Sequence, residues 1–169
     1  MLRTMMTVMA LSASTMLTAC DSSGIAGPGD VRRLAEAKAL WLSRSFTDYT
    51  YEIRTSCFCP PEVNQWSRVE VRSGVVVDVD AVDPTPNFPI TTLSYWQPID
   101  TLFADIERAI SNDGFNSVYA KVDVTYDAQY GFPTSIDYIS KPNIADAGAS
   151  ISVRNVVPLT SFVINPVRQ

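Results

Sequence analysis

The chain has 169 residues, enough for one domain with its own hydrophobic core, and its 18 acidic and 13 basic side chains give a formal net charge of −5. Because it contains no histidine, it cannot support Ser-His-Asp or Cys-His catalysis and lacks the commonest ligand of zinc and copper sites, so we expect neither an enzyme nor a metal or other cofactor. The acidic balance argues against a nucleic-acid partner, since binding to phosphates depends on clustered lysine and arginine side chains.

The first twenty residues have the pattern of a bacterial lipoprotein signal. Arg3 supplies a positive charge, and residues 5–16 form an apolar stretch that is too short to span a bilayer, which needs about 20 apolar residues. The leader ends in Leu17-Thr18-Ala19-Cys20, with small residues before the cysteine. We therefore expect cleavage before Cys20 and attachment of lipid, such as palmitate, to this residue. The alternative is a simple secretory signal cut at the same small residues, with Cys20 present by chance.

Lipidation of Cys20 would hold the protein at a membrane of the bacterial cell envelope, on the extracytoplasmic (periplasmic) side. Residues 1–19 would then be a signal peptide. Residues 20–29, rich in small polar residues and glycine, are expected to form a flexible tether. Residues 30–169 are expected to form a single domain.

In the first half of this domain, the sequence predicts a helix followed by three strands. Asp30 is predicted to cap a helix over residues 31–45, in which apolar residues recur at helical spacing. Residues 49–54 alternate between large apolar and polar side chains, which is typical of a half-buried strand. A hairpin of two further strands is predicted over residues 69–79.

Cys57 and Cys59, directly after the first predicted strand, are the only cysteines besides Cys20. If Cys20 carries lipid, they can pair only with each other or between molecules in an oxidising compartment. The Cα atoms of residues two apart in a strand are about 6.6 Å apart, so closing a disulfide requires a local bend or strain. A structural disulfide at the end of the strand is the main interpretation. A reducible redox pair and reduced thiols, either packed or bound to a soft metal, are the alternatives.

The second half of the domain repeats this order of elements. It is preceded by residues 83–89, a proline-rich stretch that is predicted to be a loop. Asp100 is predicted to cap a second helix that ends near Asn112. Three strands follow, over residues 118–126, 134–139 and 151–157. We therefore expect an α+β fold in the order αβββαβββ, with an antiparallel sheet of about six strands and both helices on one face. The repeated order also allows two diverged halves, although they share little sequence.

Asp78, Asp80 and Asp83 are close enough in sequence to gather a calcium ion. They lack the spacing and the glycine of an EF-hand loop. Because Asp78 and Asp80 alternate with valines along a predicted strand, a solvated sheet face is the favoured interpretation. We expect no metal site.

Several short motifs occur in an order that resembles a known family. They are Trp41, Tyr49-Thr50-Tyr51, Cys57-Phe58-Cys59-Pro60, Val69-Glu70-Val71 with Gly74, Leu102-Phe103, and Tyr126-Asp127 with Gly131-Phe132-Pro133. The ordered set is similar to a family of exported bacterial proteins, many of them lipoproteins, known only as a domain of unknown function (number 6174). The resemblance covers about residues 41–139. It implies an extracytoplasmic α+β domain whose paired cysteines belong to the family pattern, and it implies no activity and no catalytic residues.

The expected function is that of a lipid-anchored binding or structural module of the cell envelope, with a protein partner of unknown identity. The open sheet face or the loop over residues 83–89 would meet this partner, and the aromatic residues Phe88, Tyr95 and Trp96 are candidate contacts. Alternatively, these three rings cover the core. The alternative function is that of an envelope thiol-disulfide redox protein acting through Cys57 and Cys59.

Overall fold

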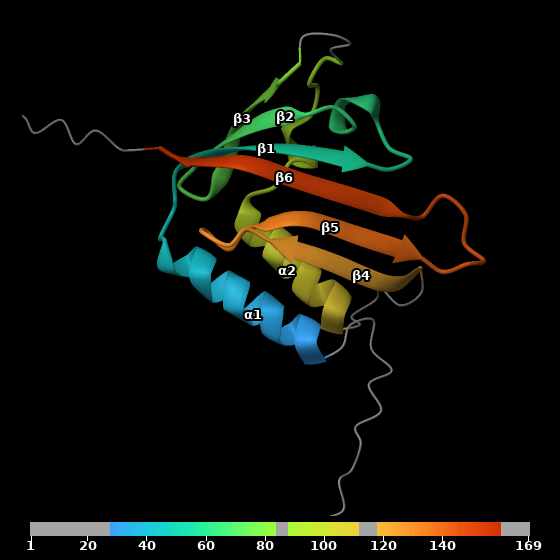
Figure 1. Ribbon diagram of the computed structural model, residues 1–169. Helices are drawn as coiled ribbons and strands as arrows, with labels where there is room; N and C mark the ends of the chain where they lie inside the picture. Colours follow the sequence, from blue (N-terminus) through green and yellow to red (C-terminus); the bar gives the residue numbers. More distant parts are fainter. Residues whose placement is uncertain (1–27, 84–87, 112–117, 160–169) are drawn as a thin grey trace, which may run out of the picture.

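The computed structural model describes residues 28–83, 88–111 and 118–159. The helices and strands are α1 (Pro28–Ser43), β1 (Tyr49–Ser56), β2 (Ser67–Arg72), β3 (Val75–Ala81), α2 (Ile99–Ser111), β4 (Tyr119–Tyr126), β5 (Pro133–Ser140) and β6 (Ala149–Pro158) (Figure 1). The predicted α+β class and the order αβββαβββ are confirmed. Cys20, the leader, most of the predicted tether, residues 84–87 and Asn112 lie outside the described residues. None of the described helices has the length and apolar character needed to cross a membrane.

All six strands form one antiparallel sheet in the order β3-β2-β1-β6-β5-β4. The centre of the sheet therefore joins the first and last strands of the chain. β1, the first strand of the first half, is central, whereas β4, the first strand of the second half, lies at an edge. The two halves are thus not two copies of one strand arrangement, despite their shared order of elements.

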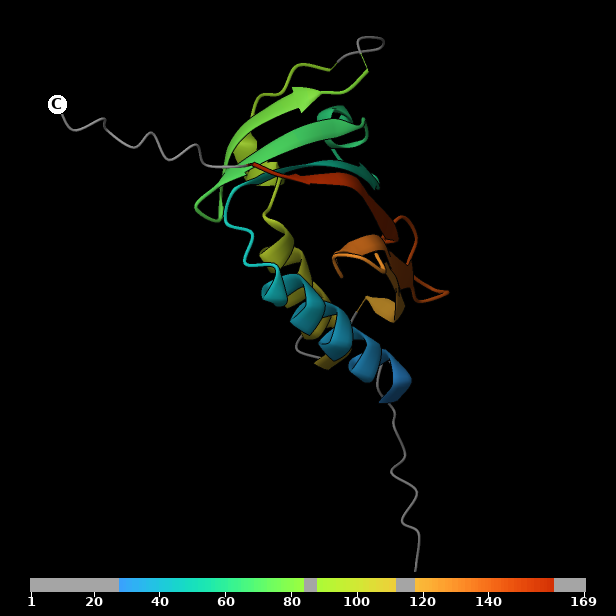
Figure 2. The same cartoon turned by 60° about the vertical axis from the view of Figure 1, so that its left-hand side comes forward.

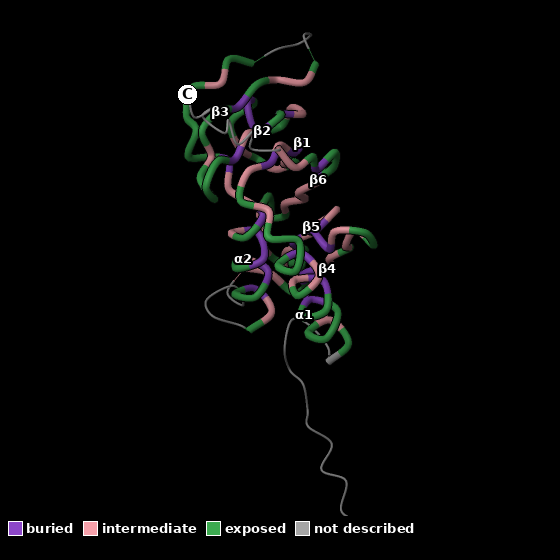
Figure 3. Tube along the Cα trace, turned by 90° about the vertical axis from the view of Figure 1, so that its left-hand side faces the viewer, coloured by how far each residue is buried: buried purple, intermediate pink, exposed green. Residues whose placement is uncertain are grey.

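Both helices pack on one face of the sheet, which curves around them (Figures 1 and 2). Tyr49 and Tyr51 of β1 are completely buried, and the ring of Tyr49 meets Trp41 of α1 edge to face at a centroid distance of 5.3 Å. The hydroxyl of Tyr49 also accepts a hydrogen bond of 2.9 Å from the backbone N–H of Ile99, at the start of α2. Buried positions recur along both helices and the strands (Figure 3), so the core lies between the two layers.

The predicted helix caps are wrong. α1 begins at Pro28, so Pro28 and Gly29 belong to the helix and not to the tether, and Asp30 lies inside the first turn, where it pairs with Arg33. Proline suits the first position of a helix because its missing N–H has no partner there in any case. Asp100 likewise lies inside the first turn of α2, which begins at Ile99. Both carboxylates still stabilise their helices from these positions, because a negative charge near the N-terminus of a helix interacts favourably with the helix dipole.

The turn after β4 passes very close to α1. Gly131 in this turn has a φ of +84°, and a Cβ atom on it would lie 2.3 Å from the carbonyl oxygen of Ala37 and 3.0 Å from the backbone nitrogen of Trp41. The turn is held by the carboxylate of Asp127, which accepts a hydrogen bond of 2.7 Å from the N–H of Tyr130. Only glycine combines this backbone conformation with this close approach.

Candidate binding site on the open face of the sheet

The sheet face that points away from the helices is open and polar. Along β1, Tyr49 and Tyr51 point into the core, whereas Glu52 and Arg54 belong to the open face. Arg54 is exposed as expected, but Glu52 is only 5% exposed. A carboxylate buried to this extent requires hydrogen-bond donors, because burying it alone is strongly unfavourable.

Three side chains bind the Glu52 carboxylate. Its Oε2 atom accepts hydrogen bonds of 2.9 Å from Arg154 Nε and from Asn155 Nδ2. Its Oε1 atom accepts a bond of 3.3 Å from the guanidinium of Arg68. Burial by itself would raise the pKa of Glu52, but the bonds from Arg154, Asn155 and Arg68 outweigh this effect and hold the pKa below its ordinary value. Glu52 is therefore ionised at neutral pH and shared by two guanidinium groups.

A β-bulge brings two consecutive residues of β6 onto Glu52. Thr50 pairs with Val157 and Glu52 with Arg154, so β6 has one residue more than β1 over this stretch. At the bulge, Asn155 has a φ of +53°, in the left-handed region. Consecutive residues of a regular strand point to opposite faces, whereas the bulge lets both Arg154 and Asn155 reach the same carboxylate.

The left-handed backbone conformation of Asn155 leads to a testable prediction. Asn155→Ala should reduce the free energy of unfolding by about 1 kcal/mol more than Asn155→Gly, although both variants lose the bond to Glu52. The reason is that glycine adopts the left-handed conformation without the clash of a Cβ atom. Urea denaturation at neutral pH measures the difference. Equal losses would mean that the left-handed conformation at Asn155 is not required.

Trp66 packs against two arginines of this face. The guanidinium carbon of Arg154 lies 3.9 Å from the centroid of the Trp66 ring, and that of Arg54 lies 5.2 Å from it. Such cation–π contacts hold a guanidinium group against the ring without neutralising its charge. Arg154 also forms an ion pair with Glu52, whereas no carboxylate in the described part of the chain lies within ion-pair distance of Arg54.

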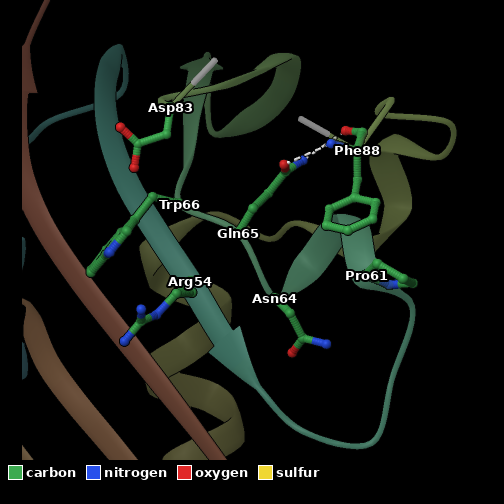
Figure 4. Close-up of a pocket in the computed structure, with 7 residues that line it drawn as sticks. All are labelled: Arg54, Pro61, Asn64, Gln65, Trp66, Asp83 and Phe88. Carbon is green, nitrogen blue, oxygen red and sulfur yellow. Dashed lines mark hydrogen bonds between the residues drawn. The ribbon is translucent and has the colours of Figure 1, made fainter. Parts of the chain in front are cut away.

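A hollow of about 430 Å³ opens beside Trp66 (Figure 4). Its lining residues are Arg54, Pro61, Asn64, Gln65, Trp66, Asp83 and Phe88. Pro61, Trp66 and Phe88 provide apolar surface, and Arg54 and Asp83 provide opposite charges. A volume of this size is in the range that holds a small ligand or a few side chains of a partner.

Two side chains near η1 (Pro61–Val63) fix the wall of this hollow. The amide of Gln65 donates a hydrogen bond of 2.8 Å to the carbonyl oxygen of Phe88 and accepts one of 3.0 Å from its N–H (Figure 4). The buried carboxylate of Glu62 accepts bonds of 2.7 Å from the N–H and 2.9 Å from the hydroxyl of Thr91. The backbone around Phe88 is therefore anchored by side-chain bonds, and its ring stays 40% exposed at the hollow.

Cys57 and Cys59 are paired in a disulfide, with their Cα atoms 5.3 Å apart. The chain bends here instead of continuing β1, which is the bend that a bridge between residues two apart requires. Asn64 braces the loop, because it accepts a bond of 3.3 Å from the N–H of Cys57 and donates one of 3.3 Å to the carbonyl oxygen of Cys59. Between the cysteines, the side chain of Phe58 is 92% exposed. Since Asn64 also lines the hollow, the disulfide loop and the hollow adjoin.

The three residues of the predicted aromatic contact patch do not lie together on the surface. Trp96 is 6% exposed and belongs to the hydrophobic core, so its prediction as a surface contact is wrong. Tyr95 is 48% exposed on η2 (Leu93–Tyr95), but its neighbours line a separate depression beside β3. Phe88 is exposed as predicted, and the structure groups it with Trp66 and Arg54 instead of with Tyr95.

The acidic residues weighed for calcium are not grouped as a site. Asp78 and Asp80 are exposed on β3, and Asp83 lines the hollow. No group of three or more acidic or cysteine side chains able to hold a metal ion occurs among residues 28–83, 88–111 and 118–159.

The sequence pattern does not single out Arg54, Trp66 or Arg154 as site residues. The alternation in β1 marks Arg54 as a solvated position, which gives no reason to single it out. Arg154 reaches Trp66 only because β6 pairs with β1. The one local signal is the position of Trp66, immediately before a strand whose outward residues are charged.

Comparison with family models gives a match over most of the described domain. A family model described as "Family of unknown function (DUF6174)" matches residues 33–158. This range includes all six strands and every residue of the hollow. No curated protein and no solved structure matches the chain significantly.

Proposed function

The chain belongs to the family of unknown function DUF6174, and since membership in this family supplies no activity, we propose a function from the geometry of the open face of the sheet. The protein is a binding module of the bacterial cell envelope, anchored by lipid on Cys20 at the extracytoplasmic side of a membrane. It contacts a protein partner through Phe58 and the hollow beside Trp66. The sequence of the leader supports the anchor, and the exposure of Phe58 and the lining of the hollow support the contact surface.

The exposure of Phe58 carries this proposal. A phenyl ring that is 92% exposed contributes almost no buried apolar area to the fold. Aromatic side chains that a partner buries contribute most to protein–protein binding. The disulfide and the two hydrogen bonds to Asn64 hold the loop that carries Phe58. Little conformational freedom is therefore lost when a partner covers the ring, which favours binding.

Photo-crosslinking in intact cells tests this proposal. A photoreactive amino acid in place of Phe58 in the full-length protein should give one discrete adduct with a partner. The control carries the same residue in place of Leu42, which is 55% exposed on α1 and not part of the hollow. Absence of an adduct from position 58, or the same set of adducts from both positions, would contradict the proposal.

Two further variants of the full-length protein, Phe58→Ala and Cys57→Ser, separate binding from thiol–disulfide chemistry. If the protein is a binding module, Phe58→Ala should abolish the cellular function, and Cys57→Ser should weaken it by loosening the loop. If the protein instead exchanges disulfides, Cys57→Ser should abolish the function and Phe58→Ala should preserve it. The second pattern would replace the binding role by a redox role.

A further inference from the structure

We propose that the hollow beside Trp66 binds an acidic peptide segment that carries an aromatic or large aliphatic side chain. This inference rests on the proposed function, because it specifies the chemistry of the partner at the same site. The apolar side chain enters the hollow, and a neighbouring carboxylate binds Arg54.

The charge of this region favours an anionic partner. Three arginines lie around Trp66 and Glu52, namely Arg54, Arg68 and Arg154, on a chain whose formal net charge is −5. Arg68 and Arg154 share the single carboxylate of Glu52. Because that carboxylate is buried and already bonded three times, it cannot neutralise Arg54 as well. Among the described residues, Arg54 is therefore the arginine of this group that has no ion pair.

Arg54 has the position and the chemistry to receive a carboxylate. Its guanidinium lies 5.2 Å from the centre of the Trp66 ring, a contact that restricts its motion. The planar guanidinium binds a carboxylate through two parallel hydrogen bonds. Asp83 lies on the other side of the Trp66 side chain in the view of Figure 4. This arrangement orients a peptide, with its carboxylate toward Arg54 and its N–H groups toward Asp83.

The apolar lining favours a peptide over other anionic or polar ligands. Pro61, Trp66 and Phe88 offer surface for one large side chain, in a hollow of about 430 Å³ that polar and charged residues also line. A lipid acyl chain would place hydrocarbon against the charges of Arg54 and Asp83 without satisfying them. A neutral sugar would leave the guanidinium of Arg54 without a counter-charge. An acidic peptide with an apolar side chain can contact both the apolar residues of the lining and the guanidinium of Arg54.

Binding of labelled peptides to the purified full-length protein tests this inference. Fluorescence polarisation compares a peptide containing Glu-Phe-Glu with matched peptides containing Lys-Phe-Lys and Glu-Ala-Glu. The first should bind roughly tenfold more tightly than either of the others, and its affinity should fall as salt is added. Arg54→Gln should weaken its binding by about tenfold, and Arg54→Lys should weaken it less.

Arg32→Gln is the matched control for Arg54→Gln. It removes the same charge from an exposed position on α1, and the affinity for the acidic peptide should not change. Equal binding of acidic and basic peptides, or full affinity in a folded Arg54→Gln variant, overturns the inference. Stronger binding of neutral oligosaccharides or of anionic lipid vesicles than of the acidic peptide also overturns it. Crosslinking from position 58 would still report on the proposed function in each of these cases.

Discussion

Replacing Gly131 by alanine is expected to reduce the free energy of unfolding by about 3 kcal/mol. Two effects add at this position. Its φ of +84° is unfavourable for any residue with a Cβ atom, and that atom would lie 2.3 Å from the carbonyl oxygen of Ala37. Since the obstacle is helix backbone, no side-chain rotation removes the clash. Either α1 or the turn after β4 must move.

Gly74→Ala is the control that separates the two effects. Gly74 has a similar φ of +74°, but nothing lies within 4 Å of the position of its Cβ atom. Gly74→Ala should therefore reduce the free energy of unfolding only by the conformational penalty of about 1–2 kcal/mol. Urea denaturation of both variants measures the difference. If Gly131→Ala loses no more stability than Gly74→Ala, the close approach of the turn to α1 is not real.

Glu52→Ala is expected to reduce the free energy of unfolding by about 2–3 kcal/mol at neutral pH. The variant loses three hydrogen bonds to a buried carboxylate. It also leaves two neighbouring guanidinium groups without their shared counter-charge. Glu52→Gln keeps the size of the side chain and isolates the loss of charge. It should lose less stability than Glu52→Ala.

The effect of the Glu52 charge should depend on pH in a defined direction. The folded-state pKa of Glu52 lies below the ordinary value of 4.5, so its charge stabilises the fold fully above about 4.5 and progressively less as the pH falls below that value. The stability difference between the native protein and Glu52→Gln should therefore shrink as the pH falls below about 4.5. A difference that stays constant over this range would contradict the assignment of Glu52 as a buried, ionised group.

Local patterns predicted the helices and strands because each element buries one face. The alternation around Tyr49 and Tyr51 located β1, and the apolar stripe around Phe103 located α2. The helix starts were less predictable, because an acidic residue is favourable both as a cap and inside the first turn, and Asp30 and Asp100 occupy the first turn. The strand order could not be predicted, since the pairing of β1 with β6 joins opposite ends of the domain.

Only those parts of the candidate site whose residues are close together in the sequence could be predicted. Cys57 and Cys59 are two residues apart, so the sequence suggested their pairing directly. The cluster around Glu52 depends on the pairing of β1 with β6 and on a bulge at Asn155, neither of which leaves a clear sequence pattern. Trp96 and Phe88 are similar as residues, and only the packing of the connection between β3 and α2 decides which of them is buried.

The three tryptophans of the chain allow a direct test of whether the hollow beside Trp66 is a binding site. Trp41 and Trp96 are 2% and 6% exposed in the core, whereas Trp66 lines the hollow. Titration of the acidic, phenylalanine-containing peptide into the isotope-labelled full-length protein, followed by NMR of the three indole N–H groups, reports on each ring separately. The expected result is a saturable shift of the Trp66 signal while the Trp41 and Trp96 signals stay in place. An unmoved Trp66 signal, or equal shifts of all three, would contradict the claim.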